Sequence, residues 1–364
     1  MYKITILGSG KIGTAIAKLL YHSGDYEVQV CDSNKTALEE LSKAIPIETE
    51  TLDVTNENDL IQSLKGQDAV VSACPYFVNV RIAKAALKTG ISYFDLTEDV
   101  QTTRMIRALA QKASSHQVFV PKCGLAPGFI SILAYALCQQ FDQLDEVRLR
   151  VGALPQYPSN KLMYNLTWST EGLINQYCNP CEAIYQGRKI EVMPLEDLEY
   201  FAVNGQEYEA FNTSGGLGTL WETLEGKVKS LNYKSIRHKG HRDLIAFLIR
   251  DLKLGDRRSL FKDILETAIP TTKQDVVLIF CTVKGLKNGQ LMQVSESSQI
   301  YNTELFDEHW GAIQLSTAAG LCAVLDLFFA GKLPSTGFVK QEEVRLEAFK
   351  SNRFGKYYFE HHLD

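Results

Sequence analysis

Apolar and polar positions alternate with two different periods in the first third of the chain. Short β-branched apolar runs recur, and amphipathic stretches with helical spacing separate them. These runs predict strands at residues 3–8, 27–32, 45–52, 68–74, 91–96 and 117–121, with helices at 11–22, 34–44, 56–64, 79–89 and 99–114. Strands joined by helices run parallel, because each crossover helix must cover a face of the sheet. The pattern therefore predicts an α/β fold, a Rossmann doubly wound parallel sheet.

The rhythm changes after Gly128. A helix at 129–140 leads into a strand at 145–154, where Val147, Leu149 and Val151 alternate with more polar neighbours, as in a half-solvated antiparallel strand. Further strands are predicted near 163–169, 182–193, 199–211, 228–237, 275–284 and 290–301, with helices near 216–226, 241–252 and 257–268. We expect an inserted α+β domain with one sheet face available for packing or dimerisation.

Residues 310–330 form an almost wholly apolar helix. It contains Gln314, Ser316, Thr317 and Asp326, so a buried helix is favoured over a membrane span. A helix that is apolar all round needs cover on most sides, and we expect it to pack on the first domain or in the cleft between domains. The predicted domains are 1–128 plus 310–350, and 129–309.

Composition narrows the classes of partner. The chain has 364 residues, more than one compact core accommodates, and a formal net charge of −5. That charge gives no reason to expect a nucleic acid or an anionic membrane as partner. The N-terminus begins with a strand and shows no signal peptide, so we expect a cytoplasmic protein whose eight cysteines are reduced. Cys178 and Cys181 have CxxC spacing, but no second pair completes a metal site, and none is predicted.

The strongest chemical signal is the segment Ile6 to Leu20, which carries a G-x-G-x-x-G pattern between a strand and a helix. Gly8 allows the tight turn, Gly10 lets the backbone approach a pyrophosphate, and Gly13 allows close helix–strand packing. Asp32 lies 19 residues beyond Gly13, at the end of the second strand, where a carboxylate accepts hydrogen bonds from ribose. The pattern predicts a bound dinucleotide.

The charge of Asp32 favours NAD over NADP, because it would repel a 2′-phosphate; Lys35 nearby keeps NADP open. Asp53 follows the third strand, where such folds contact adenine, or it caps the segment that begins at Thr55. The residues expected to contact the cofactor are Gly8, Ser9, Gly10, Lys11, Ile12, Gly13, Asp32, Asp53, Val54, Ala73 and Pro75.

Polar side chains follow three later strands at the edge where ligands bind in this fold. They are Tyr76, Asp95, Thr97, Glu98, Lys122 and Cys123. Structural roles remain open for several of them: Tyr76 as an aromatic lid on a helix start, Thr97 as an N-cap and Cys123 as a small apolar filler.

The segment "KCGLAPGF" (122–129) leaves the sixth strand. Gly124, Pro127 and Gly128 predict a tight, stiff crossing with unusual backbone angles. We expect Cys123 to lie beside the nicotinamide, with a catalytic thiolate as the less favoured role.

Several segments together resemble the saccharopine dehydrogenase family, which includes saccharopine reductases and lysine 6-dehydrogenases. They are "ILGSGKIG", "CPYFVNVRIAKAALKTGISYFDLTED", "CGLAPGF", "YEAFNTSGGLGTLWETLEGKV", "LNYKSIRHKGH", "QDVVLIFCTVKG" and "WGAIQLSTAAGLCAVLDLFFAGKLP". The resemblance implies a Rossmann domain that includes the C-terminal helix, an inserted substrate domain and a homodimer. It also implies oxidation, by a pyridine nucleotide, of a carbon–nitrogen bond in a lysine-related amino acid.

The resemblance also assigns roles to single residues. It places Pro75 and Tyr76 near the nicotinamide, and the turn glycines at Gly124 and Gly128. Ala126 stands where the reductases have aspartate, which favours the lysine 6-dehydrogenase type. The family pattern "RYPGH" is matched at Arg237, Gly240 and His241, with His238 and Lys239 replacing Tyr-Pro.

Amine oxidation needs a base that deprotonates the amine, and a cation or donor nest that binds the substrate carboxylate. The candidates for proton transfer are Tyr76, Asp95 and Glu98, with Cys123 or Lys122 as secondary options. The substrate-binding candidates are Thr97, Thr213 in the loop 212–216, Arg237, His238 and His241. Arg148 and Arg150 are expected on a solvated strand face. Secondary-amine reductases, homospermidine synthase-like transferases and a non-catalytic NAD-binding regulator remain alternatives.

Overall fold

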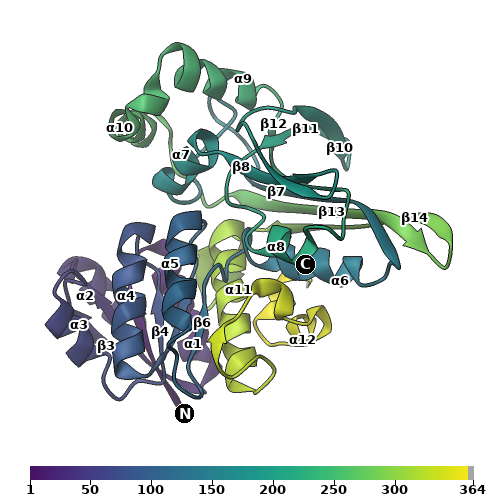
Figure 1. The fold of residues 1–364 in the computed structure, drawn as a ribbon. Helices are drawn as coiled ribbons and strands as arrows, with labels where there is room; N and C mark the ends of the chain where they lie inside the picture. The colour runs from purple at the N-terminus through teal and green to yellow at the C-terminus, as the bar shows by residue number, and fades with distance from the viewer. Residues whose placement is uncertain (360–364) are drawn as a thin grey trace. The chain divides into compact units, whose positions relative to one another are not determined.

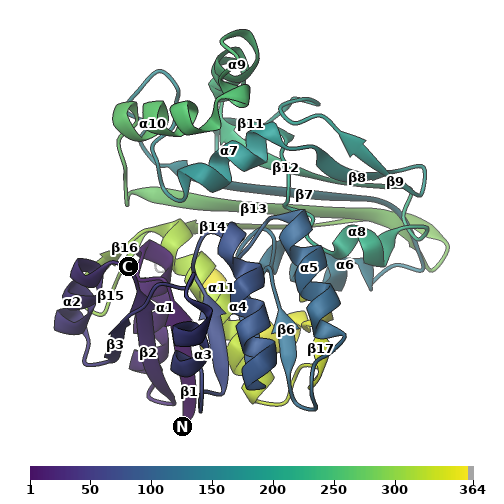
Figure 2. The same cartoon turned by 60° about the vertical axis from the view of Figure 1, so that its left-hand side comes forward.

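The computed structural model describes residues 1–359 (Figures 1 and 2). The chain forms two compact units. Unit 1 contains residues 1–132 and 317–359, and unit 2 contains residues 133–316. The limits expected from the sequence, after residues 128 and 309, lie four and seven residues before these, and unit 1 is built from two separate segments of chain.

Unit 1 contains the alternating strands and helices of the first third of the chain. Its strands are β1 (Tyr2–Leu7), β2 (Tyr26–Asp32), β3 (Glu48–Thr51), β4 (Ala69–Ser72), β5 (Ser92–Asp95), β6 (Val118–Val120) and β17 (Gly337–Phe338). Its helices include α1 (Lys11–Ser23), α2 (Lys35–Ala44), α3 (Glu57–Ser63), α4 (Tyr76–Thr89) and α5 (Val100–Ala110). All seven strands pair in parallel in the order β17-β6-β5-β4-β1-β2-β3, which confirms the predicted doubly wound sheet.

Successive residues of a strand serve opposite faces of this sheet. Tyr93 of β5 joins the apolar cluster that α3, α4 and α5 build through Leu60, Ile82 and Ile106. The next residue, Phe94, lies on the other face, and its ring centroid is 5.8 Å from that of Phe328. Strand β5 is therefore buried on both faces, as a central parallel strand must be.

Within unit 1, one carboxylate connects the C-terminal segment to β2, in addition to the pairing of β17 with β6. Helix α11 (Ala312–Phe329) carries Asp326, which accepts hydrogen bonds from the hydroxyl of Tyr26 (2.6 Å), the amide of Asn352 (2.7 Å) and Nη2 of Arg353 (2.7 Å). By length and composition α11 could cross a membrane, but 67% of it is buried inside the structure, as in a core helix. Short helix α12 (Leu346–Lys350) follows it.

Unit 2 is built on a mixed sheet (Figure 2). Its strands are β7 (Gln143–Pro155), β8 (Cys181–Tyr185), β9 (Arg188–Val192), β10 (Glu199–Val203), β11 (Gln206–Asn212), β12 (Ser230–His238), β13 (Asp275–Lys287) and β14 (Gln290–Tyr301). The main order is β10-β11-β12-β7-β13-β14, and β8 pairs with β12 and β9. Its helices include α7 (Thr170–Cys178), α8 (Leu220–Leu224), α9 (His241–Ala246) and α10 (Arg258–Ala268), and α6 (Phe129–Cys138) contains the boundary between the units.

Three predictions for this unit need correction. Residues 163–169 form a loop with a single bridge at Leu166 instead of a strand, and the sequence pattern missed α7 directly after it. Strand β7 is antiparallel only to β13 and pairs in parallel with β12, so it is an interior strand of a mixed sheet. Because β7 has neighbouring strands on both sides, its charged side chains can pair with side chains of those strands on the same face of the sheet.

Candidate functional site

The glycine turn of unit 1 connects β1 to α1. Gly8 has a φ of +105°, and a Cβ there would stand 2.9 Å from the carbonyl oxygen of Ala73. A Cβ on Gly13 would stand 1.9 Å from the carbonyl oxygen of Gly8, so only glycine lets α1 begin this close to the strand. Gly10 differs, because within residues 1–359, apart from its two chain neighbours, nothing lies within 4 Å of the position that its Cβ would take. Its backbone borders open space at the start of α1.

Asp32 ends β2 beside this turn. Its carboxylate accepts hydrogen bonds from the backbone N–H (2.6 Å) and the hydroxyl (2.9 Å) of Ser9, and from the N–H of Asn34 (2.8 Å). Partial burial acts to raise the pKa of Asp32, but these hydrogen bonds outweigh it and hold the pKa below its ordinary value. Asp32 is therefore an ionised acceptor attached directly to the glycine turn.

The other predicted cofactor residues lie along the same edge. Asp53 is exposed and accepts from the N–H of Thr55 at 2.8 Å, while Asn56 caps α3, so Asp53 makes a turn instead of a helix cap. Ala73 continues β4 by donating its N–H to Leu7 (2.8 Å), and Pro75 precedes α4. Lys11 is exposed, whereas Ile12 and Val54 are half-buried.

This edge fits a dinucleotide. The first turn of α1 presents backbone N–H groups and the positive end of the helix dipole to the open space beside Gly10. The ionised Asp32 is placed to accept from ribose hydroxyls. Both features are what a pyrophosphate and its adjacent ribose require.

Asp95 is fully buried at the end of β5. Its carboxyl accepts hydrogen bonds from the hydroxyl of Tyr93 (2.7 Å) and from the backbone N–H groups of Thr97 (2.9 Å) and Lys122 (3.0 Å). Burial raises its pKa above the ordinary value despite these donors. With its donors all supplied by the protein, Asp95 holds two loops in place and has no exposed atom for a substrate.

Three neighbouring candidates have different surroundings. Thr97 is buried, and its hydroxyl accepts from the N–H of Asp99 (3.2 Å); Asp99, and not Thr97, is the N-cap of α5. Glu98 is half-buried, and burial raises the pKa of its carboxyl. No residue among 1–359 other than Glu98 itself donates a hydrogen bond to that carboxyl. Tyr76 opens α4, half-buried and edge-on to the exposed ring of Phe77.

Cys123 is a structural thiol. It is fully buried, its Sγ donates to the carbonyl of Val120 (3.0 Å), and burial raises its pKa well above the ordinary value, so a thiolate is disfavoured. The strain of the crossing lies on either side of it. Lys122 has a φ of +66°, and a Cβ on Gly128 (φ +134°) would stand 1.9 Å from the carbonyl oxygen of Gly124. The crossing is as tight as the sequence predicted.

Arg237 is the last residue but one of β12 in unit 2 and is 2% exposed. Its Nε donates to the hydroxyl of Tyr177 (2.7 Å) and its Nη1 to its neighbouring carbonyl at Ile236 (2.8 Å). The guanidinium carbon lies 5.4 Å from the ring centroid of Tyr164. Within residues 1–359 no carboxylate pairs with Arg237, and its Nη2 has no partner yet is not sealed from solvent. A buried cation without a counter-charge is costly unless an anion binds.

The other side chains predicted to bind substrate make their hydrogen bonds to other residues of the protein. Nε2 of His238 donates to the carbonyl oxygen of Pro155 at 2.8 Å, and burial lowers the pKa of this histidine. His241 is fully buried, and both of its ring nitrogens have protein partners. The hydroxyl of Thr213 bonds to that of Ser235 (2.7 Å), and a Cβ on Gly216 would enter the ring of Tyr233. The hydroxyl of Thr213 and the backbone of Gly216 therefore have packing roles within unit 2.

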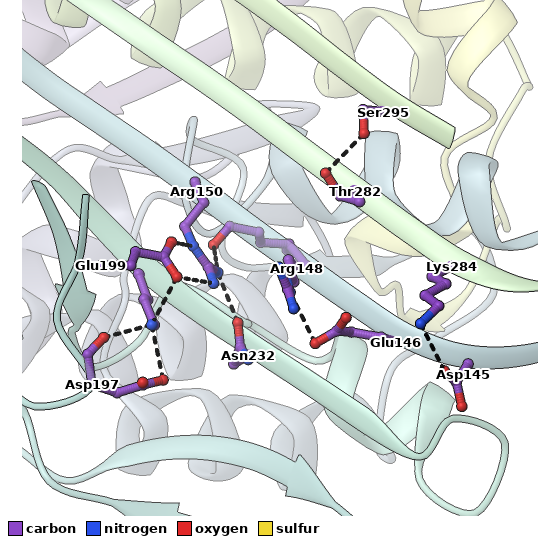
Figure 3. A network of polar contacts seen from close by, with 12 residues as sticks. Asp145, Glu146, Arg148, Arg150, Asp197, Glu199, Asn232, Thr282, Lys284 and Ser295 are labelled. Carbon is purple, nitrogen blue, oxygen red and sulfur yellow. Dashed lines mark hydrogen bonds and ion pairs between the residues drawn. The ribbon is translucent and has the colours of Figure 1, made fainter. Parts of the chain in front are cut away.

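Arg150 corrects a further prediction. Arg148 is exposed, as expected, but Arg150 is 3% exposed and forms an ion pair with Glu199 (Figure 3). Its Nη1 also donates to Asn232 (2.7 Å), and Lys234 shares Glu199 at 2.9 Å. The exposed face expected from the alternation along β7 holds for Arg148 and not for Arg150, because the acceptors of Arg150 come from β10 and β12, which the alternation does not include.

Sequence reasoning missed Tyr164 and Tyr177, whose rings surround Arg237. Tyr177 lies on α7, the helix that was not predicted. A signal was present, since Ser169 accepts from Gly172 as an N-cap and Leu173, Ile174 and Tyr177 follow at helical spacing.

Comparison with known proteins identifies the family of both units. Residues 4–120 match the family model "Saccharopine dehydrogenase NADP binding domain", and residues 124–351 match "Saccharopine dehydrogenase C-terminal domain". The saccharopine dehydrogenase [NADP(+), L-glutamate-forming] of Saccharomyces cerevisiae is 26% identical over 266 residues, 68% of this chain and 57% of that protein. Mitochondrial alpha-aminoadipic semialdehyde synthase of Bos taurus is 22% identical over 312 residues, 80% of this chain and 32% of that protein. The chain spans less than two thirds of the length of these curated relatives.

Solved structures agree in fold. Apo saccharopine dehydrogenase (L-Glu forming) from Saccharomyces cerevisiae has a TM-score of 0.78 at 15% identity, over 96% of this chain and 95% of that one. A homospermidine synthase from Legionella pneumophila in complex with NAD has a TM-score of 0.70 at 14% identity, over 98% and 89%. Two family models together extend over both units, and unit 1 contains the glycine turn expected of a nucleotide-binding domain. This chain belongs to the saccharopine dehydrogenase family.

Proposed function

We propose that this protein is an NAD(P)-dependent oxidoreductase that oxidises a carbon–nitrogen bond of a lysine-related amino acid. The observation that supports the oxidoreductase activity is the glycine turn of unit 1, where Gly10 borders open space and Asp32 is held ionised beside it. Membership of the saccharopine dehydrogenase family supports the same conclusion. When bound, a pyridine nucleotide supplies the hydride acceptor.

The state of Asp32 favours NAD over NADP. Its two oxygens are engaged by Ser9 and Asn34, so the carboxylate is fixed where a 2′-phosphate would have to lie. Lys35 is exposed, and its ammonium lies 3.8 Å from Glu39, so it does not offset that charge. We therefore assign NAD as the preferred cofactor.

Arg237 indicates which class of substrate binds. Three N–H bonds of its guanidinium have no partner within residues 1–359, and no carboxylate of the described chain neutralises it. A planar guanidinium with free donors is suited to a carboxylate. The substrate is therefore an amine that carries a carboxylate, not a simple diamine.

Glu98 is the proposed proton acceptor. A protonated amine cannot release hydride, so a base must take one proton from the amine nitrogen before the C–H bond breaks. Asp95 is saturated with donors and the thiol of Cys123 is buried, whereas the carboxyl of Glu98 is half-buried with a raised pKa. Hydride leaves the carbon, the C=N bond forms, and water then adds to give a carbonyl compound and a free amine.

The reaction type is proposed to be that of a lysine 6-dehydrogenase. Ala126 stands where the resembled reductases have aspartate, which leaves that position without a carboxylate. The test is the absorbance of reduced nucleotide after L-lysine, saccharopine and putrescine are offered in turn with NAD. We expect turnover with lysine above that with saccharopine and none with putrescine, which has no carboxylate. Equal rates with putrescine would refute the role of Arg237, and tight NAD binding with no turnover of any substrate would indicate a regulator.

A further inference from the structure

A buried chain of hydrogen bonds in unit 2 ends on Arg237. The Nε of Arg237 lies 2.7 Å from the hydroxyl of Tyr177, and that hydroxyl lies 3.0 Å from Nε2 of His241. On its other side, Nδ1 of His241 lies 2.8 Å from the carbonyl oxygen of Leu162. The three side chains are 0–2% exposed, so solvent does not compete for these bonds.

The direction of every bond in this chain follows from one carbonyl. A carbonyl oxygen only accepts, so Nδ1 of His241 must carry the proton and donate to Leu162. In the neutral ring Nε2 is then an acceptor, and the hydroxyl of Tyr177 donates to it. That hydroxyl keeps a lone pair, which accepts from Nε of Arg237. Burial lowers the pKa of His241 to about 3, in accord with a neutral ring.

This chain determines which edge of the guanidinium stays available. Nε is bonded to Tyr177, one N–H of Nη1 goes to Ile236, and the rings of Tyr164 and Tyr177 lie at 5.4 and 5.6 Å from its central carbon. The edge that contains Nη2 is left without a protein partner among residues 1–359. A rotation of the guanidinium would break the bond to Tyr177, so the free edge points in one direction only.

We propose that Tyr177 and His241 are positioning residues that hold Arg237 with its Nη2 edge toward the carboxylate of the substrate. This inference rests on the proposed function, in which Arg237 binds that carboxylate. Tyr177 orients Arg237 directly, and His241 orients Tyr177 by accepting its proton. Neither residue touches substrate.

The test is the Tyr177→Phe variant of the full chain with NAD and saccharopine, and with L-lysine in parallel. It removes one hydroxyl, leaving Nε of Arg237 without its acceptor. We expect the KM for the amino acid to rise about tenfold or more, since a hydrogen bond to a charged group contributes about that factor. The kcat and the KM for NAD should stay near the wild-type values. Tyr208→Phe is the control, because Tyr208 is a buried tyrosine of the same unit whose ring lies beside Phe201 and His238, and nothing in residues 1–359 joins it to Arg237.

Two further variants separate positioning from general stability. His241→Gln offers an amide oxygen that can accept from Tyr177, whereas His241→Leu offers none. We expect the KM of His241→Gln to lie closer to wild type than that of His241→Leu. This comparison also decides the matter if Tyr177→Phe fails to fold.

The outcomes also distinguish the two proposals. Arg237→Lys keeps the charge but loses the planar fork. If Arg237→Lys raises the KM and Tyr177→Phe does not, the positioning role is wrong while the carboxylate site stands. If Arg237→Lys leaves the KM unchanged, the carboxylate site itself is wrong. Equal KM values for the two His241 variants would also overturn the positioning role.

Discussion

The two glycines at the start of α1 should respond to alanine in opposite ways. A Cβ on Gly13 would lie 1.9 Å from the carbonyl oxygen of Gly8, against an ordinary contact of about 3.5 Å. Helix and strand would have to separate by roughly 1.5 Å. Overpacking of this kind costs about 3 kcal/mol, and the better helix propensity of alanine returns about 1 kcal/mol. We expect Gly13→Ala to lose about 2 kcal/mol of unfolding free energy.

Gly10→Ala should leave the fold almost unchanged. In the described part of the chain, nothing beyond the two neighbouring residues lies within 4 Å of the new Cβ, and the backbone angles, φ −70° and ψ −173°, suit alanine. The only cost is the poorer N-cap, within about 1 kcal/mol. The methyl group would instead occupy the space where the pyrophosphate approaches the helix, so the Kd for NADH should rise about tenfold or more.

Urea unfolding and a fluorescence titration with NADH measure the two effects separately. We expect near wild-type unfolding and weakened NADH binding in Gly10→Ala, and a loss of stability in Gly13→Ala. Wild-type NADH affinity in Gly10→Ala would show that the nucleotide does not bind at this turn. Equal loss of stability in both variants would show that the packing argument is wrong.

Two predictions concern single carboxylates. Asp32→Ser should lower the preference for NAD over NADP about tenfold or more in comparative kcat/KM measurements, because like charges near a protein surface repel by a few kcal/mol; an unchanged ratio would contradict the role of Asp32. Asp275 is buried and accepts from the N–H groups of Ala312 (2.5 Å) and Ile313 (3.0 Å), and burial raises its pKa to about 6. The folded state then holds this proton more tightly than the unfolded chain does. Protonated Asp275 therefore adds about 3 kcal/mol to the free energy of unfolding below pH ~4, and this addition is lost as the pH rises through about 6. Urea unfolding of Asp275→Asn against wild type from pH 4 to 7 should show that difference, and parallel curves would refute it.

Local patterns predicted unit 1 well. Its strands are short apolar runs buried on both faces, and its glycine turn is a contiguous segment, so the information lies within a few residues. Ser9, Gly10 and Asp32 were placed correctly along one edge by the spacing alone, because parallel strands end at the same edge of the sheet.

The pattern failed where partners are distant in sequence. Arg150 is buried by Glu199, 49 residues away, and Arg237 is oriented by Tyr177, 60 residues away. The periodicity along β7 or β12 gives no information about partners so distant in sequence. His241 and Asp95 were assigned to substrate contact and catalysis from residue type, whereas burial and complete hydrogen bonding give them structural roles. Residue type identifies what a side chain can do, and the contacts decide whether it is available.

The most direct test of the central claim is the initial rate of NAD reduction by the wild-type chain and by Glu98→Gln, with L-lysine and with putrescine. We expect the wild type to form NADH from lysine and none from putrescine, and Glu98→Gln to have a kcat lower by about 100-fold with unchanged NAD binding. Wild-type kcat in Glu98→Gln would contradict the proposed base. A wild-type chain that binds NAD tightly but reduces none with lysine or saccharopine would contradict the oxidoreductase function itself.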